Sequence, residues 1–91
     1  MIRSFRSKGL RRFFERGEAR LLSVQNPTRI ARILRALEAA TSPEDMDLPG
    51  LRFHALRGPE KRYAVDASGN YRVTFGWDGE NAIDIDLEDY H

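Results

Sequence analysis

Apolar side chains recur at helical spacing near the start of the chain. Leu10, Phe13 and Phe14 fall on one face of a helix, and Gly17 follows them as a residue that commonly ends helices. We therefore predict a short first helix that ends near Gly17. Residues 1–5, which precede it, are predicted to form a short extended segment.

A second helix is predicted by a stronger pattern. Asn26 followed by Pro27 is a typical helix start, because asparagine caps the helix and proline fits its first turn. The apolar stripe that follows has i, i+3, i+4, i+7 spacing and consists of Ile30, Ile33, Leu34 and Leu37. We expect this helix to end near Ala40, and a further helical turn to begin at residues 42–45.

From Leu51 onward the period changes from that of a helix to two, the period of a strand. Four segments are predicted as strands: 51–55, 62–65, 71–77 and 83–88. Glycine-containing turns separate them and favour an antiparallel meander. The predicted fold is therefore α+β, with two N-terminal helices packed on one face of a small antiparallel sheet and a polar, open opposite face.

The strand parity also places polar side chains. His54 and Arg72 occupy polar positions in their strands, and Tyr90 shares the polar parity of the last strand. The apolar positions of that strand are Ile83, Ile85 and Leu87. Asp89 and His91 have apolar parity, but strand ends twist and fray, so their direction stays open.

Length and composition narrow the function classes. The 91 residues suit one domain, 1–91, with a modest core, and we expect no large cofactor. The absence of cysteine excludes disulfides, thiolate metal sites and cysteine nucleophiles, and fits a reducing cytoplasm. The first residues lead into a charged helix and not a long apolar run. We therefore expect a soluble cytoplasmic protein without a signal peptide or membrane span.

Charge is segregated along the chain although the net charge is only +1. Residues 1–37 hold 10 Lys/Arg and 2 acidic residues, a net charge of +8, while residues 38–91 hold 5 and 12, a net charge of −7. A basic helical half is consistent with a polyanionic partner. On charge alone, solvated helices that are rich in arginine are the better-supported interpretation.

The chain holds the side chains needed to cleave RNA without a metal. A 2′-hydroxyl must lose a proton to attack phosphorus, the leaving 5′-oxygen must gain one, and arginine can hold the phosphate oxygens. His54, His91, Tyr90, Asp89 and Arg72 supply these groups. Structural alternatives remain, with His54 as a hydrogen-bonded surface residue, Arg72 as a packing stem and Tyr90 as an edge of the core. No spacing typical of a metal site or of a serine hydrolase elbow is present.

Three segments together resemble a known family of bacterial toxins. They are Phe53-His54-Ala55-Leu56-Arg57-Gly58, Asn70-Tyr71-Arg72 and the final Asp89-Tyr90-His91. The chain resembles the RelE/ParE superfamily over nearly its whole length, specifically the HigB-like branch. It departs from that branch at Arg57, where lysine is usual, at Tyr63-Ala64-Val65, which replaces a Trp-Ser-Ile type segment, and at Tyr71, which replaces a common tryptophan.

The resemblance implies the RelE-like fold and a ribosome-dependent mRNA endonuclease, the toxin of a type II toxin–antitoxin system. Carried over to matching positions, the catalytic residues are His54, Asp89, Tyr90, His91 and Arg72. The residues expected to contact RNA are Arg57, Arg11, Arg12, Arg29, Arg32 and Arg35. The expected partners are the ribosome, mRNA and a helix-turn-helix antitoxin, with no metal, cofactor or membrane.

Two other functions share the fold and stay open on sequence alone. One is a ParE-like, non-enzymatic poison of DNA gyrase. The other is a catalytically weak member that mainly binds its antitoxin. The set of proton-transfer groups favours the nuclease, because a gyrase binder needs none of them.

Overall fold

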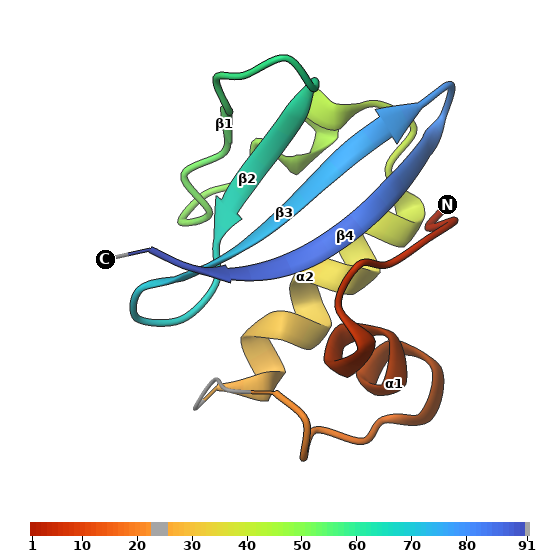
Figure 1. The fold of residues 1–91 in the computed structure, drawn as a ribbon, viewed down its shortest axis with the longest axis vertical. Helices are drawn as coiled ribbons and strands as arrows, with labels where there is room; N and C mark the ends of the chain where they lie inside the picture. The colour runs from red at the N-terminus through yellow and green to blue at the C-terminus, as the bar shows by residue number, and fades with distance from the viewer. Residues whose placement is uncertain (23–25, 91) are drawn as a thin grey trace.

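The computed structural model describes residues 1–22 and 26–90, and it has the predicted α+β architecture (Figure 1). The helical elements are α1 (Lys8–Arg16), α2 (Pro27–Ala39) and the short 3-10 helix η1 (Pro43–Met46). The strands are β1 (His54–Ala55), β2 (Arg62–Asp66), β3 (Tyr71–Asp78) and β4 (Asn81–Asp89). They form one antiparallel sheet in the order β1-β2-β3-β4, which confirms the predicted meander.

The ends of both helices follow from the residues that flank them. Ser7 accepts a hydrogen bond from the backbone of Leu10 and caps α1, which ends at Gly17 with a left-handed φ of 71°. Asn26 accepts from the backbone of Arg29 and caps α2, and Pro27 stands in its first turn. Both predicted helices are confirmed. In the part of the chain that the structure describes, no helix is long and apolar enough to cross a membrane.

The predicted helical turn after α2 is also present, as η1. The backbone N–H groups of Thr41 and Ser42 donate to the Asp45 carboxylate. These bonds favour the charged form and lower the pKa of the Asp45 carboxyl from its ordinary value of 3.8. Met46, at the end of the turn, is fully buried in the core.

The core lies between the helices and one face of the sheet. α2 contributes Ile30, Ile33, Leu34 and Leu37, and α1 contributes Leu10. The sheet contributes Val65, Val73, Phe75, Ala82 and Ile85. These residues share one face of the sheet, which α2 covers, so the opposite face is left for polar side chains.

The edges of the sheet differ from the sequence prediction in two ways. The segment before α1 runs parallel to β4, with bridges from Ile2 to Ala82 and from Phe5 to Ile85. The first predicted strand, residues 51–55, is reduced to β1, because Arg52 adopts a left-handed φ of 53° that interrupts an extended chain.

The parity prediction fails at one position in β4. Gly76 pairs with Ile83 and Thr74 pairs with Asp86, so two residues of β4 lie opposite Phe75. This β-bulge includes Asp84, whose φ is 50°. Because the extra residue reverses the faces, Ile83 lies on the polar side of the sheet, where its side chain would be 3.2 Å from a Cβ added to Gly76. The assignment of Ile83 to the apolar face is therefore wrong.

Candidate active site on the polar face of the sheet

The sheet face opposite α2 carries polar side chains in register, and we call it the site face. His54 on β1 pairs with Ala64, and Ala64 pairs with Thr74 on β3. Arg72 pairs with Asp66 on one side and with Glu88 on the other. The site face therefore includes His54, Arg62, Ala64, Asp66, Arg72, Thr74 and Glu88, with Tyr90 just beyond β4.

Three of the predicted catalytic residues meet on the site face. The Nη1 atom of Arg72 lies 3.4 Å from Nε2 of His54. On its other side, the Arg72 guanidinium carbon lies 4.4 Å from the centre of the Tyr90 ring, a cation–π contact. The backbone N–H of Tyr90 donates to the carbonyl of Asn70 at 2.8 Å, which extends the β3–β4 pairing to the tyrosine. Arg72 therefore joins the histidine to the tyrosine.

These contacts determine the hydrogen-bonding state of the His54 ring. A guanidinium can only donate, so Nε2 of His54 accepts from Arg72 with its lone pair. The other ring nitrogen, Nδ1, lies 2.9 Å from the carbonyl oxygen of Arg52 and must then carry the proton and donate. The arrangement favours the tautomer with its proton on Nδ1, in which the Nε2 lone pair points toward Arg72.

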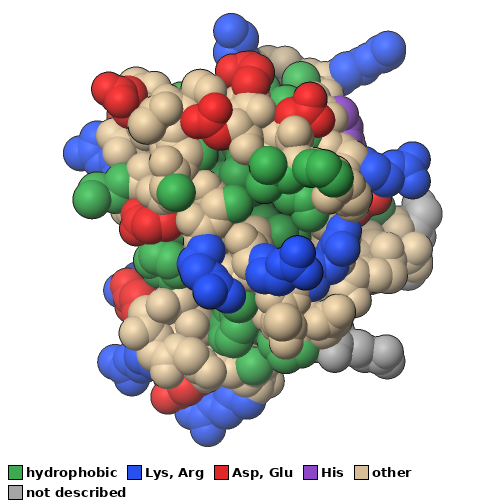
Figure 2. Space-filling view, turned by 180° about the vertical axis from the view of Figure 1, so that it is seen from behind, with side chains coloured by type: hydrophobic (Ala, Val, Ile, Leu, Met, Phe, Trp, Pro, Cys, Tyr) green, Lys and Arg blue, Asp and Glu red, His purple; other side chains and the backbone are tan. Residues whose placement is uncertain are grey.

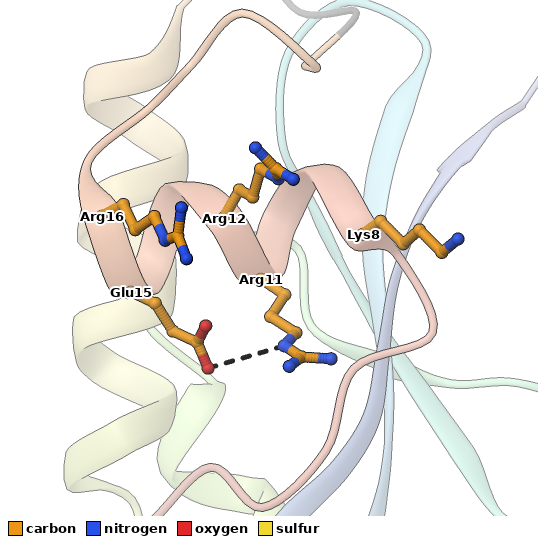
Figure 3. A pocket seen from close by; sticks show the side chains of 5 residues that line it. All are labelled: Lys8, Arg11, Arg12, Glu15 and Arg16. Atoms are coloured by element: carbon orange, nitrogen blue, oxygen red, sulfur yellow. Dashed lines mark ion pairs between the residues drawn. The ribbon is translucent and has the colours of Figure 1, made fainter.

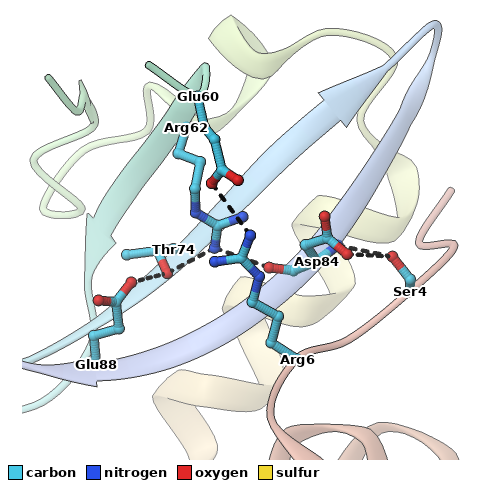
Figure 4. Close-up of polar contacts among 7 residues, drawn as sticks. All are labelled: Ser4, Arg6, Glu60, Arg62, Thr74, Asp84 and Glu88. Atoms are coloured by element: carbon cyan, nitrogen blue, oxygen red, sulfur yellow. Dashed lines mark hydrogen bonds and ion pairs between the residues drawn. The ribbon is translucent and has the colours of Figure 1, made fainter. Parts of the chain in front are cut away.

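A second network occupies the centre of the site face (Figure 4). Arg62 is only 8% exposed, and its Nη2 atom donates to Oγ1 of Thr74 at 3.1 Å and to the carbonyl of Asp84 at 2.9 Å. Thr74 in turn donates to the carboxylate of Glu88. Gly76 is suited to this arrangement, because a Cβ there would be 3.7 Å from an Arg62 nitrogen and 3.2 Å from Ile83. The predicted open face is therefore covered at its centre.

Beside this network a cavity of about 320 Å³ lies next to Tyr90. Its lining includes the side chains of Arg57, Arg62 and Glu88. Arg6, from the segment before α1, also lines it and pairs with Glu60 at 3.2 Å. The cavity offers positively charged groups and an aromatic ring side by side, which are the groups that bind a phosphate and stack on a base.

The other two predicted catalytic residues are Asp89 and His91. Asp89 pairs with Tyr71 in the sheet, so its parity is that of the apolar face, although its side chain is exposed at the end of β4. His91 lies outside the described residues. The structure thus brings together His54, Arg72 and Tyr90, and the roles of Asp89 and His91 stay predictions.

The basic residues of α1 gather around a separate hollow. Its lining residues are Lys8, Arg11, Arg12, Glu15 and Arg16 (Figure 3). Arg11 pairs with Glu15 at 3.5 Å, and Arg12 pairs with Glu18 at 3.6 Å. These side chains are 39–65% exposed, so the pairs contribute little to stability and leave the arginines accessible to a partner.

The three predicted RNA contacts on α2 differ from one another. Arg32 and Arg35 are exposed on the helix, and Lys and Arg side chains gather across this side of the molecule (Figure 2). Arg29 instead donates to the carbonyls of Gly50 at 2.8 Å and Asp66 at 3.5 Å. These bonds tie the start of α2 to the sheet, so Arg29 has a structural task that the sequence did not predict.

Sequence reasoning missed several residues that build the site. Polar strand parity could have placed four of them on this face: Arg62, Asp66, Thr74 and Glu88. Which of them contact one another depends on strand register, which the sequence does not reveal. Arg52 gave no signal, since its contact with His54 is made by its backbone carbonyl. Among residues 1–22 and 26–90, no group of three or more His, Cys, Asp or Glu could hold a metal ion.

Two comparisons with known proteins show what the chain is similar to. The sequence model of a family described as the RelE-like toxin of type II toxin–antitoxin system HigB matches residues 3–91. A relative from Proteus vulgaris, named Endoribonuclease HigB, is 33% identical over 92 residues, and the alignment covers 100% of both chains.

Proposed function

Because the chain belongs to the family of RelE-like HigB toxins of type II toxin–antitoxin systems, we propose that its endoribonuclease activity cuts messenger RNA on the ribosome. The name of the Proteus vulgaris relative, an endoribonuclease, supports the activity. The observation that carries the proposal is the contact of Arg72 with both His54 and Tyr90 on the site face. A histidine, an arginine and a tyrosine within reach of one phosphate are the groups that RNA cleavage requires.

His54 is the proposed general base. Its Nε2 lone pair points into the site, and its Nδ1 proton is engaged by the Arg52 carbonyl. Nε2 can therefore take the proton of an RNA 2′-hydroxyl. The hydroxyl oxygen then bonds to the adjacent phosphorus, the bond from phosphorus to the 5′-oxygen breaks, and a 2′,3′-cyclic phosphate remains.

Arg72 is proposed to leave His54 and bind the phosphate. Two N–H groups of a guanidinium match two phosphate oxygens, and the negative charge on these oxygens grows during the reaction. Tyr90 lies against Arg72 and lines the cavity, so its ring can stack on a base or direct its hydroxyl at the substrate.

The leaving 5′-oxygen needs a proton, and the proposed donor is a residue at the end of the sequence. His91 follows Tyr90 directly, and we propose that it acts as the general acid. Asp89 is proposed to orient an imidazole. Both assignments rest on the resemblance to the family.

The basic side chains outside the site are proposed to bind ribosomal RNA. Arg57 lines the cavity beside Tyr90, and Arg11, Arg12, Arg32 and Arg35 are exposed on the helices. Attraction through phosphate contacts makes the association sensitive to salt. Because ribosomes are the proposed target, the toxin is expected to act in the cytoplasm.

The partner of the toxin is an antitoxin, as the family description states. We propose that this antitoxin is a helix-turn-helix protein. The ParE-like alternative, a gyrase poison, is not favoured, because the relative is an endoribonuclease and the site face carries proton-transfer groups.

Mapping of cut ends on a defined message tests the proposal. Purified protein is incubated with translating ribosomes, and the 5′ ends of the message are mapped; naked message is the control. Cuts at the codon in the ribosomal decoding site, absent from naked message, are expected. Equal cutting of naked message would contradict ribosome dependence, and intact message in both reactions would contradict the nuclease.

A further inference from the structure

Four residues close a circuit of contacts around His54, which we call the His54 circuit. The Nδ1 atom of His54 lies 2.9 Å from the Arg52 carbonyl. The side chain of Arg52 returns to the sheet, where its Nε atom lies 3.7 Å from Oδ2 of Asp66. The other oxygen of Asp66, Oδ1, lies 3.4 Å from Nε of Arg72. Arg72 closes the circuit at 3.4 Å from Nε2 of His54.

Asp66 is the member of the circuit that fixes Arg72. The two residues lie directly opposite each other on β2 and β3, so their side chains are neighbours on the sheet and can contact each other directly. Their side chains are only 32% and 34% exposed, so this pair is screened less by water than the pairs on the helices. Because Asp66 holds the Nε side of the guanidinium, the Nη atoms remain for His54 and for a phosphate.

The backbone of Arg52 adopts an unfavourable conformation within the His54 circuit. Its φ of 53° is a left-handed value that glycine or asparagine adopts more easily than arginine. In this conformation its carbonyl faces the His54 ring while its side chain faces Asp66. A glycine would satisfy the backbone but could not reach Asp66. Because the Arg52 side chain is 83% exposed, its pair with Asp66 is weaker than the pair of Asp66 with Arg72 and only assists it.

We propose that Asp66, assisted by Arg52, is a positioning residue for the reaction, a role that rests on the proposed function of His54 and Arg72. It presents Arg72 to His54, keeps the proton of His54 on Nδ1 and leaves Nε2 ready to accept a proton. Asp66 does not touch RNA. Its effect passes through Arg72 to the base.

Three variants separate the links of the circuit. Asp66→Asn removes the charge that both arginines face. Arg52→Gly removes only the guanidinium and keeps the backbone carbonyl in a conformation that glycine favours. Asp78→Asn is the matched control, because Asp78 also lies on the sheet and pairs with an arginine, Arg3 at 3.8 Å, in a pair that includes none of the circuit residues.

Nitrogen NMR of the imidazole gives a readout that does not depend on activity. It is recorded in a His91→Gln background, so that His54 is the single histidine. The parent and Asp78→Asn are expected to show the Nδ1–H tautomer. Asp66→Asn is expected to show a mixture of both tautomers, and Arg52→Gly a smaller change. Thermal unfolding identifies any variant that fails to fold; if Asp66→Asn does, Arg52→Gly carries the test.

Cleavage on ribosomes, with His91 restored, then tests the consequence. Asp66→Asn is expected to lower kcat about tenfold, the size expected when one charged hydrogen bond is removed, with KM unchanged. Asp66→Glu should restore part of the activity. The parent tautomer and parent kcat in Asp66→Asn would overturn the proposal, as would a changed tautomer with the parent kcat. If the parent itself cuts no RNA, while the tautomer still depends on Asp66, the proposed function fails and the circuit stands.

Discussion

On the site face the Arg72 guanidinium lies among Asp66, His54 and Tyr90, whereas on α1 the guanidinium of Arg11 has one i,i+4 partner, Glu15. Side-chain exposure follows the same division, at 34% for Arg72 and 65% for Arg11. A charge held on several sides has a fixed direction, which proton transfer and phosphate binding require. An exposed charge has no fixed direction but acts at a distance through its field. The difference supports the proposal that the site face performs the chemistry and that the helices attract RNA.

The largest expected effect is that of removing the base from the site face. His54→Gln should lower the rate of message cleavage by about 100-fold or more, the usual contribution of a general base. The side chain lies outside the core, so the melting temperature should stay near that of the parent. Single-turnover cleavage on ribosomes measures the change. A rate within a few-fold of the parent would show that the histidine is structural.

Arg72→Ala should have the next largest effect. Removing a charged hydrogen bond to phosphate costs about 1.5–3 kcal/mol, which corresponds to a decrease in rate of about 10- to 150-fold. Arg72→Lys should recover only part of this, because an ammonium lacks the planar fork of the guanidinium. The same cleavage measurement compares the two variants. Full activity of the lysine variant would rule out a bidentate grip.

Exposed charge on α2 should affect association and not chemistry. The double variant Arg32→Gln, Arg35→Gln should bind ribosomes more weakly at low salt, with a log–log salt slope smaller by about 1 for each phosphate that is no longer neutralised. The rate of cleavage on saturated ribosomes should not change. The control is the double variant Arg3→Gln, Arg20→Gln, which has the same net charge as the α2 variant. It should bind ribosomes as the parent does. Equal weakening in the control would show that net charge alone sets the affinity.

The smallest expected effect is that of Asp45, whose charge belongs neither to the site face nor to the basic surface of the helices. Asp45→Asn should lower the melting temperature slightly at neutral pH, because asparagine cannot accept the bonds from Thr41 and Ser42 as well as a carboxylate. The folded-state pKa of Asp45 lies below 3.8, so its contribution is present above that pH and is lost as the pH falls through the folded value. The difference in melting temperature between the variant and the parent should therefore shrink at acid pH. Cleavage should be unaffected.

Most of the fold could be predicted from the sequence, because helix caps, apolar stripes and strand alternation each depend on residues close together in the chain. Asn26 and Gly17 mark helix ends by chemistry that does not depend on the rest of the chain. Strand parity likewise placed His54 and Arg72 on the same face. The bulge at Asp84 could not be predicted, since it depends on how β4 pairs with β3 and gives no periodic signal.

The site was predictable as a set of residue types but not as a network. Arginine is usually exposed, so burial of Arg62 beneath the cavity contradicts the expectation for its type. Its partners come from β3 and β4, 12 and 22 residues away. The RNA contact of Arg29 stays a prediction. Its hydrogen bonds to the carbonyls of Gly50 and Asp66 could not be predicted, because they form only when the sheet and α2 are packed together.

Removal of one oxygen atom from the message tests most directly whether the site face performs the proposed chemistry. The nucleotide upstream of the scissile phosphate is changed to its 2′-deoxy form, and cleavage and ribosome binding are measured on otherwise identical messages. Attack by the 2′-hydroxyl predicts that cutting stops at this phosphate while binding is unchanged. Continued cutting at the deoxy position would contradict the assignment of His54 as the base for that hydroxyl.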